Sequence, residues 1–267
     1  MSENRMRLQM NRFVYVTVFV FCVVATAYPQ SSEHAADKLG SGLSISAGLG
    51  HLAVLDDYIS NQWYSGSLPY FEAAWLRRSD SSAYRLGFIY RYSSDIRNYN
   101  VSAGITEALL SLDFLSPTGG FSLLGRDVFA YWGPSAEFFV YYRQQNIASG
   151  GNALFNAYSF AMFFSGGINS TLSMPLESDF TLMLSGELNL LSFGARLTDL
   201  NDHDARFVKF GSLLSGVRGH TDLMLRYDLS NALSASAHYR FEICQSGTWN
   251  YLIAVSDNLV ATVTYRL

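Results

Sequence analysis

The sequence predicts an all-β protein, a closed antiparallel transmembrane β-barrel of about ten strands, with eight or twelve strands as alternatives. Apolar residues alternate along the chain and form no long apolar run after residue 27. Aromatic residues are abundant, with 17 Tyr and 19 Phe, while only 15% of the residues are charged. Alternating segments separated by turn residues, with many aromatic side chains, are typical of membrane barrels. Because lipid offers no hydrogen bonds, such a sheet has to close on itself.

The last ten residues form the clearest predicted strand. Side chains of a strand alternate between its two faces. One face would carry Leu259, Ala261, Val263, Tyr265 and Leu267, and the other Val260, Thr262, Thr264 and Arg266. The first face suits lipid and the second suits the interior of a barrel.

Residues 1–27 are predicted to be a secretory signal peptide. Arg5, Arg7 and Arg12 precede an apolar run, and Ala25-Thr26-Ala27 forms a small-x-small cleavage site. The alternatives are a retained membrane helix, which needs about 20 apolar residues, and a lipid anchor on Cys22, which the bulky Phe21 disfavours. The chain would then consist of the signal peptide, a short periplasmic segment at 28–40 and the barrel at 41–267.

Charge and cysteine content exclude several functions. Cleavage after residue 27 removes three Arg and one Glu, so Lys+Arg falls from 18 to 15 and Asp+Glu from 22 to 21, a net charge of −6. This negative charge argues against nucleic-acid binding, which requires a basic patch. Cys244 would be alone and could form neither an internal disulfide nor a cysteine-based metal site. We expect no cofactor and no metal.

Ten strand-like segments follow the signal peptide. A phase change in the fourth predicts a β-bulge near Thr106–Glu107, and Pro134, which cannot donate to a ladder, suggests another in the fifth. Residues 116–126 would form a long, glycine-rich connection. The strands are expected at about 41–52, 68–78, 84–93, 99–115, 128–143, 156–174, 179–196, 207–228, 232–244 and 250–267.

A network of polar side chains is predicted to fill the lumen. A three-residue turn at 229–231 would place Asp222 opposite His238 and Arg218 opposite Glu242. A shift of one residue in the turn would instead pair Asp222 with Arg240, and is the second choice. The predicted lumen polar network consists of Arg85, Glu137, Glu187, Arg218, His220, Asp222, Arg226, His238, Arg240 and Glu242. A hydrolytic triad of Ser236, His238 and Asp222 is disfavoured, because residues i and i+2 of a strand lie about 7 Å apart.

The signal peptide and the strands resemble bacterial outer-membrane β-barrel proteins of Gram-negative cells. In that family the last strand carries an assembly signal, which here would be Val263, Tyr265 and Leu267; Leu267 replaces the usual terminal aromatic residue. The resemblance implies an outer-membrane location, lipids and the barrel-assembly machinery as partners, and a monomer. Tyr265 and Leu267 would lie in the periplasmic girdle, where Leu43 closes the sheet, and Asp257 would mark the outer lipid boundary.

An extracellular loop resembles part of the omptin proteases, which place an Asp–His dyad after the seventh strand. This loop carries Asp199, Asp202, His203 and Asp204. The Asp-x-His spacing is absent, and the loop after the third strand offers only Asp95 where omptins have two aspartates. A solvated acidic loop or a weak divalent-cation site built from oxygen ligands is the alternative.

Four functions follow from these features. The leading expectation is a structural or surface-interaction barrel with a lumen largely filled by side chains and no enzymatic activity. The second is a narrow porin-like channel for ions or small solutes. An omptin-like surface protease and a lipid-modifying enzyme are the third and fourth.

Overall fold

The computed structural model describes residues 41–56, 60–79, 82–98, 101–148, 154–176, 179–200, 203–212, 216–246 and 252–267. The expected signal peptide and the segment 28–40 lie outside these residues. The strands are β1 (Gly42–Asp56), β2 (Ser60–Ser79), β3 (Ser82–Arg97), β4 (Ser102–Leu123), β5 (Arg126–Ala148), β6 (Leu154–Pro175), β7 (Phe180–Leu200), β8 (His203–Ser212), β9 (Gly216–Asp228), β10 (Leu233–Ser246) and β11 (Leu252–Arg266). None of the described residues forms a helix long and apolar enough to cross a membrane.

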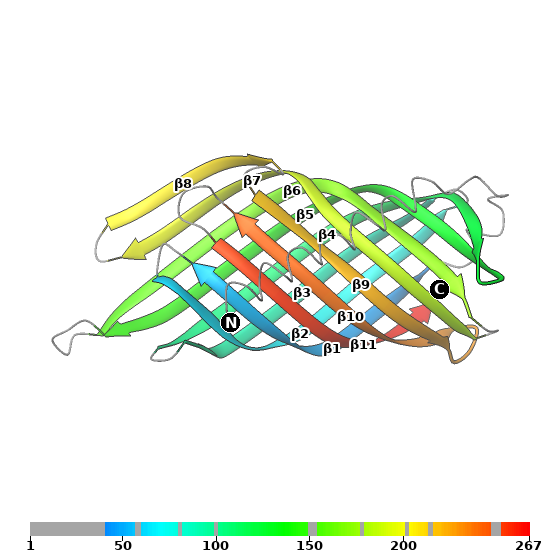
Figure 1. Cartoon of the computed structure of the whole chain (residues 1–267), viewed down its shortest axis with the longest axis horizontal. Helices are drawn as coiled ribbons and strands as arrows, with labels where there is room; N and C mark the ends of the chain where they lie inside the picture. Colours follow the sequence, from blue (N-terminus) through cyan, green and yellow to red (C-terminus); the bar gives the residue numbers. More distant parts are fainter. Residues whose placement is uncertain are drawn as a thin grey trace.

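Ten strands form a closed antiparallel barrel, as predicted. The ring runs from β1 through β7 and then through β9, β10 and β11 back to β1 (Figure 1). The predicted eighth strand, 207–228, is divided into two. β9 completes the ring by pairing with the first half of β7. β8 pairs only with the second half of β7, from Leu191 to Leu200, so that a β7–β8 hairpin projects beyond the barrel.

The first and last strands close the sheet, with Leu43 at the predicted place. Leu43 lies opposite Tyr265, and His51 lies opposite Asp257. The start of β1, the end of β11 and the short turns lie at one end of the barrel, which is the periplasmic end in bacterial barrels. The strands extend further at the other end, where residues 53–56 and 60–67, between the first two predicted strands, belong to β1 and β2.

Both of the expected β-bulges are absent, and β4 has a bulge at a different position. The β3–β4 and β4–β5 registers run without a shift through Thr106–Glu107, and β5 keeps one register through Pro134. The bulge in β4 lies instead between Pro117 and Gly119. β4 therefore continues to Leu123, and the expected long connection 116–126 is only a tight turn at Leu124-Gly125, with φ angles of 54° and 75°.

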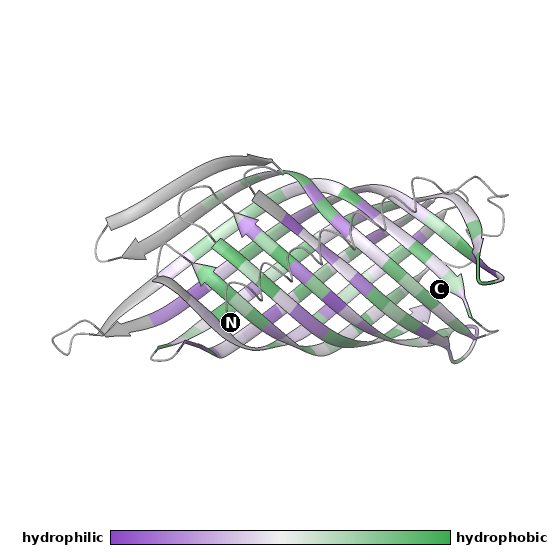
Figure 2. Ribbon diagram, in the orientation of Figure 1, coloured by the Kyte–Doolittle hydropathy of each residue, from purple (hydrophilic) through white to green (hydrophobic). Residues whose placement is uncertain are grey.

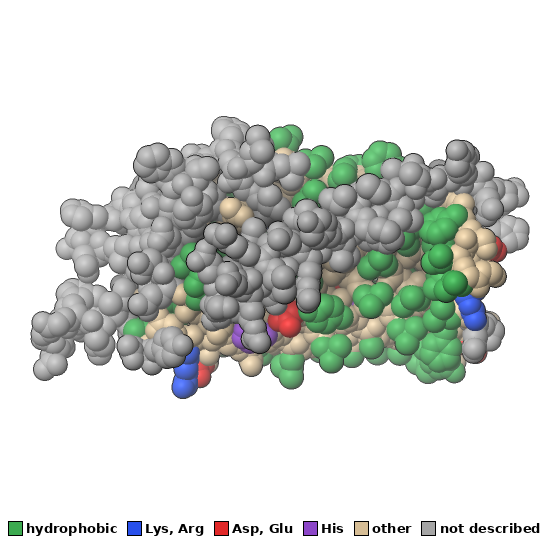
Figure 3. Space-filling view, in the orientation of Figure 1, with side chains coloured by type: hydrophobic (Ala, Val, Ile, Leu, Met, Phe, Trp, Pro, Cys, Tyr) green, Lys and Arg blue, Asp and Glu red, His purple; other side chains and the backbone are tan. Residues whose placement is uncertain are grey.

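The outer wall is apolar, as strand alternation predicts. Hydrophobic residues alternate with polar ones along the strands (Figure 2), and hydrophobic side chains gather on the described part of the wall (Figure 3). Aromatic side chains gather near the periplasmic end: the rings of Tyr84 and Phe114 lie 5.0 Å apart, and those of Phe180 and Tyr227 lie 4.6 Å apart. Such girdles sit at the membrane–water interface. At the other end, His51 and Asp257 face outward, 3.9 Å apart.

The interior is divided into two halves. The extracellular half is filled by buried apolar side chains that come mostly from the strand ends opposite the termini. We call this cluster the apolar plug: Leu52, Val54, Tyr64, Leu68, Tyr70, Ile89, Ile96, Ala103, Ile105, Leu109, Phe139, Tyr141, Ala161, Cys244, Leu252, Ala254 and Val260. The apolar plug explains why the prediction of a bulge at Thr106–Glu107 is wrong. Ala103 and Ile105 are apolar because they face the plug, in phase with the buried Glu107 on the same strand.

Candidate functional site

The periplasmic half of the lumen holds a cavity of about 440 Å³, which we call the periplasmic cavity. Its mouth is lined by Gly42, Asp228 and Arg266, at the ends of β1, β9 and β11. The side chains of Asp228 and Arg266 are about a quarter exposed, and Arg266 hydrogen-bonds to Asp228. Deeper in the barrel, Glu72 and Asp222 are buried. The cavity thus opens toward the periplasmic end and extends to mid-barrel.

Every member of the lumen polar network faces the interior. Its arginines pair with carboxylates, and its two histidines lie 3.4–3.7 Å from carboxylate oxygens. The network also includes residues that the sequence did not single out. Arg85 bridges Glu72 on β2 and Asp113 on β4. The pairs of the predicted members are Arg85–Glu72, Arg85–Asp113, Arg218–Glu137, His220–Glu187, His220–Asp222, Arg226–Asp228, His238–Asp222, Arg240–Asp222 and Arg240–Glu242.

Pairs across the lumen close the inner end of the periplasmic cavity. Arg91 on β3 lies 2.5 Å from Glu242 on β10 and 3.3 Å from Glu107 on β4. Arg218 on β9 pairs with Glu137 on β5. The small cavity that these side chains themselves line measures only about 10 Å³, which is close to the minimum for one water molecule. Among the described residues, the periplasmic cavity therefore ends at this charged layer, with the apolar plug behind it.

The preferred register between β9 and β10 is wrong, and the second choice holds. Asp222 lies opposite Arg240, and Arg218 lies opposite Cys244 rather than Glu242. The turn is centred one residue later than expected. Ser230 explains the shift, because its hydroxyl accepts hydrogen bonds from the backbone N–H groups of Ala232 and Leu233.

The arrangement around His238 resembles a triad in outline but lacks its chemistry. Its Nδ1 lies 3.5 Å from Asp222, and its Nε2 lies 3.0 Å from the hydroxyl of Thr262 rather than that of Ser236. The Thr262 hydroxyl donates in turn to Ser46. An oxyanion hole needs free N–H donors, whereas β11 is paired on both sides here, with β1 and with β10.

The omptin-like positions lie only partly within the described residues. The backbone places Asp199 opposite Asp204 and Leu200 opposite His203, at the tip of the β7–β8 hairpin. Asp202 falls outside the described residues, and the side chains of the other three positions are not described.

Several lumen residues escaped the sequence-based prediction. They include Glu72, Arg91, Glu107 and Asp113, all buried. Alternation did place Arg91 on the inner face of β3, since it shares that face with Arg85. The missing information was which strands lie across the lumen, because partners such as Arg91 and Glu242 are 151 residues apart in sequence.

Comparison with known proteins shows the fold. No family model matches the chain, and no curated protein sequence matches it. The crystal structure of the outer membrane protease OmpT from Escherichia coli is similar, with a TM-score of 0.52 and 8% identity over 85% of this chain and 96% of that one. The present chain is an integral outer-membrane β-barrel protein. At this level of identity the likeness to OmpT concerns the fold alone.

Other outer-membrane barrels resemble this outer-membrane protein more loosely. The translocator domain of the autotransporter NalP from Neisseria meningitidis has a TM-score of 0.49 and 10% identity, covering 99% of this chain and 96% of that one. Neisserial surface protein A has a TM-score of 0.38 and 10% identity, covering 84% of this chain and 97% of that one.

Proposed function

We propose that this protein is a barrel without a conducting pore, with a structural or surface-interaction role carried by its extracellular end. The apolar plug is the observation that supports this proposal. Tyr64, Leu68 and Ile105 are at most 2% exposed and lie in the path that a solute would have to take through the lumen. An ion in this path would lose its hydration without compensating ligands, which is costly in an apolar medium.

The charged layer adds a second barrier to conduction. Arg91 and Glu242 pair across the lumen and are almost fully buried. Within the plug, the guanidinium of Arg143 lies 4.1 Å from the centre of the Tyr64 ring. Such a cation–π contact ties β5 to β2 and stabilises most when it is desolvated. Opening a path would require breaking these contacts together.

The extracellular end has the extent that a surface role requires. β1 and β11 continue beyond His51 and Asp257, and the β7–β8 hairpin projects beyond the ring. Exposed strand ends and loops on a rigid scaffold commonly carry binding function. The expected partners at the wall are outer-membrane lipids.

Conductance in planar bilayers tests the proposal. We expect no unitary currents from the purified barrel, under conditions in which a general porin conducts. A variant with Tyr64→Ser and Ile105→Ser would hydrate the plug and is expected to produce brief current steps. Steady unitary currents from the wild-type barrel would instead establish the narrow-channel alternative.

A surface protease is the second candidate function. The OmpT-like fold supports it, together with the acidic residues and His203 at the tip of the β7–β8 hairpin. Incubation of the folded barrel with a peptide library tests it. Cleavage by the wild type that is lost in His203→Ala would establish a protease, and its absence is expected under our proposal. Ester hydrolysis that is lost in His238→Ala would likewise establish a lipid-modifying enzyme.

A further inference from the structure

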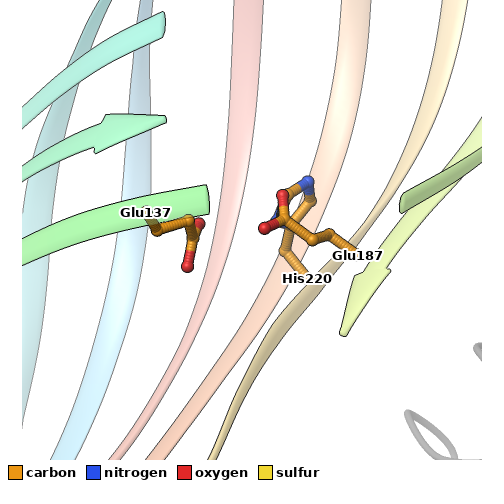
Figure 4. Close-up of side chains that lie close together, drawn as sticks. All are labelled: Glu137, Glu187 and His220. Atoms are coloured by element: carbon orange, nitrogen blue, oxygen red, sulfur yellow. Dashed lines mark ion pairs between the residues drawn. The ribbon is translucent and has the colours of Figure 1, made fainter. Parts of the chain in front are cut away.

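We propose that Glu137, Glu187 and His220 form a binding site for one divalent transition-metal ion, such as Zn²⁺, inside the lumen. One ligand atom from each of these three buried residues lies within 4.8 Å of the other two. They converge from β5, β7 and β9 (Figure 4). We call them the carboxylate–imidazole cluster. The site is independent of the proposed surface role.

The mixture of ligands points to a transition metal. Imidazole nitrogen suits Zn²⁺ and similar ions, and carboxylate oxygen completes their coordination. Metal–ligand bonds of about 2.0–2.2 Å place neighbouring ligand atoms roughly 3–3.5 Å apart. His220 Nδ1 and Glu187 Oε2 are already 3.7 Å apart. Small side-chain rotations would therefore complete the site.

The second nitrogen of His220 is oriented as in known metal sites. Its Nε2 lies 3.4 Å from a carboxylate oxygen of Asp222. A metal-binding histidine commonly donates its other ring N–H to a carboxylate, which fixes the tautomer and the ring orientation. Here a proton on Nε2 directed at Asp222 would leave the lone pair of Nδ1 facing Glu187.

Unpartnered oxygen atoms surround the cluster. Glu187 is 2% exposed, yet its Oε1 has no hydrogen-bond partner. Asn189 is also 2% exposed and lies against the cluster, where its Nδ2 donates to Glu137 Oε2 at 2.6 Å, while its own Oδ1 is unpartnered. Arg218 donates to the same Oε2 of Glu137. Buried acceptors without donors are costly, and a cation satisfies them.

Charge balance supports the same conclusion. Among the described residues of the lumen, eight carboxylates, namely the seven buried ones and Asp228, stand against seven arginines: Arg85, Arg91, Arg143, Arg218, Arg226, Arg240 and Arg266. Glu187 is the one carboxylate among them whose nearest basic partner is a histidine rather than an arginine. A divalent ion beside Glu187 would compensate this excess of negative charge.

The periplasmic cavity supplies the route of entry. Glu187, His220 and Asp222 all line it. A hydrated ion entering from the periplasm would meet the cluster at the inner end of the cavity, before the charged layer formed by Arg91 and Glu242.

Metal binding to the tag-free, folded barrel tests this inference. We expect one Zn²⁺ per chain after equilibration with Zn²⁺ and removal of the excess, and a saturable calorimetric titration. Co²⁺ in the same site should give visible absorption bands of a nitrogen- and oxygen-coordinated ion. Glu187→Gln should abolish stoichiometric binding, and Asp222→Asn should weaken it about 10–100-fold.

Glu107→Gln is the matched control. It removes another buried lumen carboxylate, one that lies outside the cluster and whose partner Arg91 keeps Glu242. It should bind Zn²⁺ like the wild type. The heat-dependent gel mobility of each variant reports whether its barrel is folded. Absence of Zn²⁺ from the folded wild type, or equal binding by wild type and Glu187→Gln, would overturn the inference.

Discussion

Arg91 on β3 and Glu242 on β10 form an ion pair across the lumen, with a nitrogen–oxygen distance of 2.5 Å. Three strands, β2, β1 and β11, separate them along the wall of the barrel. The pair therefore crosses the interior and joins opposite walls. It also forms the boundary between the periplasmic cavity and the apolar plug.

Breaking this layer should destabilise the barrel strongly. Arg91→Met leaves Glu107 buried without an arginine partner, and the loss of one member of a buried pair costs about 3–5 kcal/mol. Replacing both residues, Arg91→Met with Glu107→Leu, should cost less than the single change. Urea unfolding in lipid vesicles measures both. Equal midpoints for Arg91→Met and the wild type would show that the layer is not stabilising.

The apolar plug should behave as a packed core. Ile105→Ala creates a cavity at a residue with 0% exposure, and such changes cost about 2–5 kcal/mol. Ile45→Ala is the control, because Ile45 is 73% exposed on the outer wall and lipid fills the space. Equal losses of unfolding free energy for the two variants would argue against a packed plug.

Depth in the membrane should determine the cost of a charge on β11. Ala261 lies on the outer face between Asp257 and the periplasmic girdle, so Ala261→Arg should cost about 2–4 kcal/mol. Leu267→Arg lies near the interface and should cost about 0–1 kcal/mol. Refolding titrations of both variants into vesicles supply the two values. The opposite order would place the lipid band elsewhere.

The predicted assembly signal at Val263, Tyr265 and Leu267 has its own test. Tyr265→Ala should lower the amount of folded barrel in the outer membrane of cells several-fold, while the purified variant still refolds. Tyr239→Ala is a suitable control, because Tyr239 is similarly exposed on the neighbouring strand β10 (47% against 54%). Equal amounts of the two variants in the outer membrane would show that Tyr265 is not part of the assembly signal.

The Leu124-Gly125 turn carries local strain. Leu124 has a φ of 54° and is 91% exposed, and a branched side chain is unfavourable in that conformation. Leu124→Asn should stabilise the hairpin by about 0.5–1 kcal/mol, since asparagine is preferred in such two-residue turns. Gly125→Ala, at a φ of 75°, should destabilise it by about 1 kcal/mol. The same unfolding experiment measures both, and no change in either variant would exclude strain.

The period of two along each strand was sufficient to predict the barrel, its closure at Leu43 and Tyr265, and the inward orientation of the lumen polar network. It could not predict register, because moving the centre of the turn at Ser230 by one residue changes the position opposite Asp222 from His238 to Arg240. It also misplaced the bulge in β4. The prediction assumed a polar interior, whereas Ala103 and Ile105 face an apolar one.

The candidate metal site lay beyond prediction for a different reason. Glu137, Glu187 and His220 are far apart in sequence and belong to three strands. Their proximity depends on the curvature of the closed wall and on the paired positions of Glu187 and His220 in the β7–β9 register. No motif of fixed spacing in the sequence indicates that these three residues are neighbours, and the sequence therefore predicted no metal site.

Because of the apolar plug, the lumen is accessible to water from its periplasmic end only. Water that reaches His220 and Asp222 comes from the periplasm. These side chains are therefore exposed to the pH and the ions of the periplasm and not to those of the medium outside the cell. A thiol reagent too large for general porins, added to intact cells, should leave the variant Ser236→Cys unmodified and should modify it once the outer membrane is breached. The lumen around these residues is therefore continuous with the periplasm and closed to the external medium.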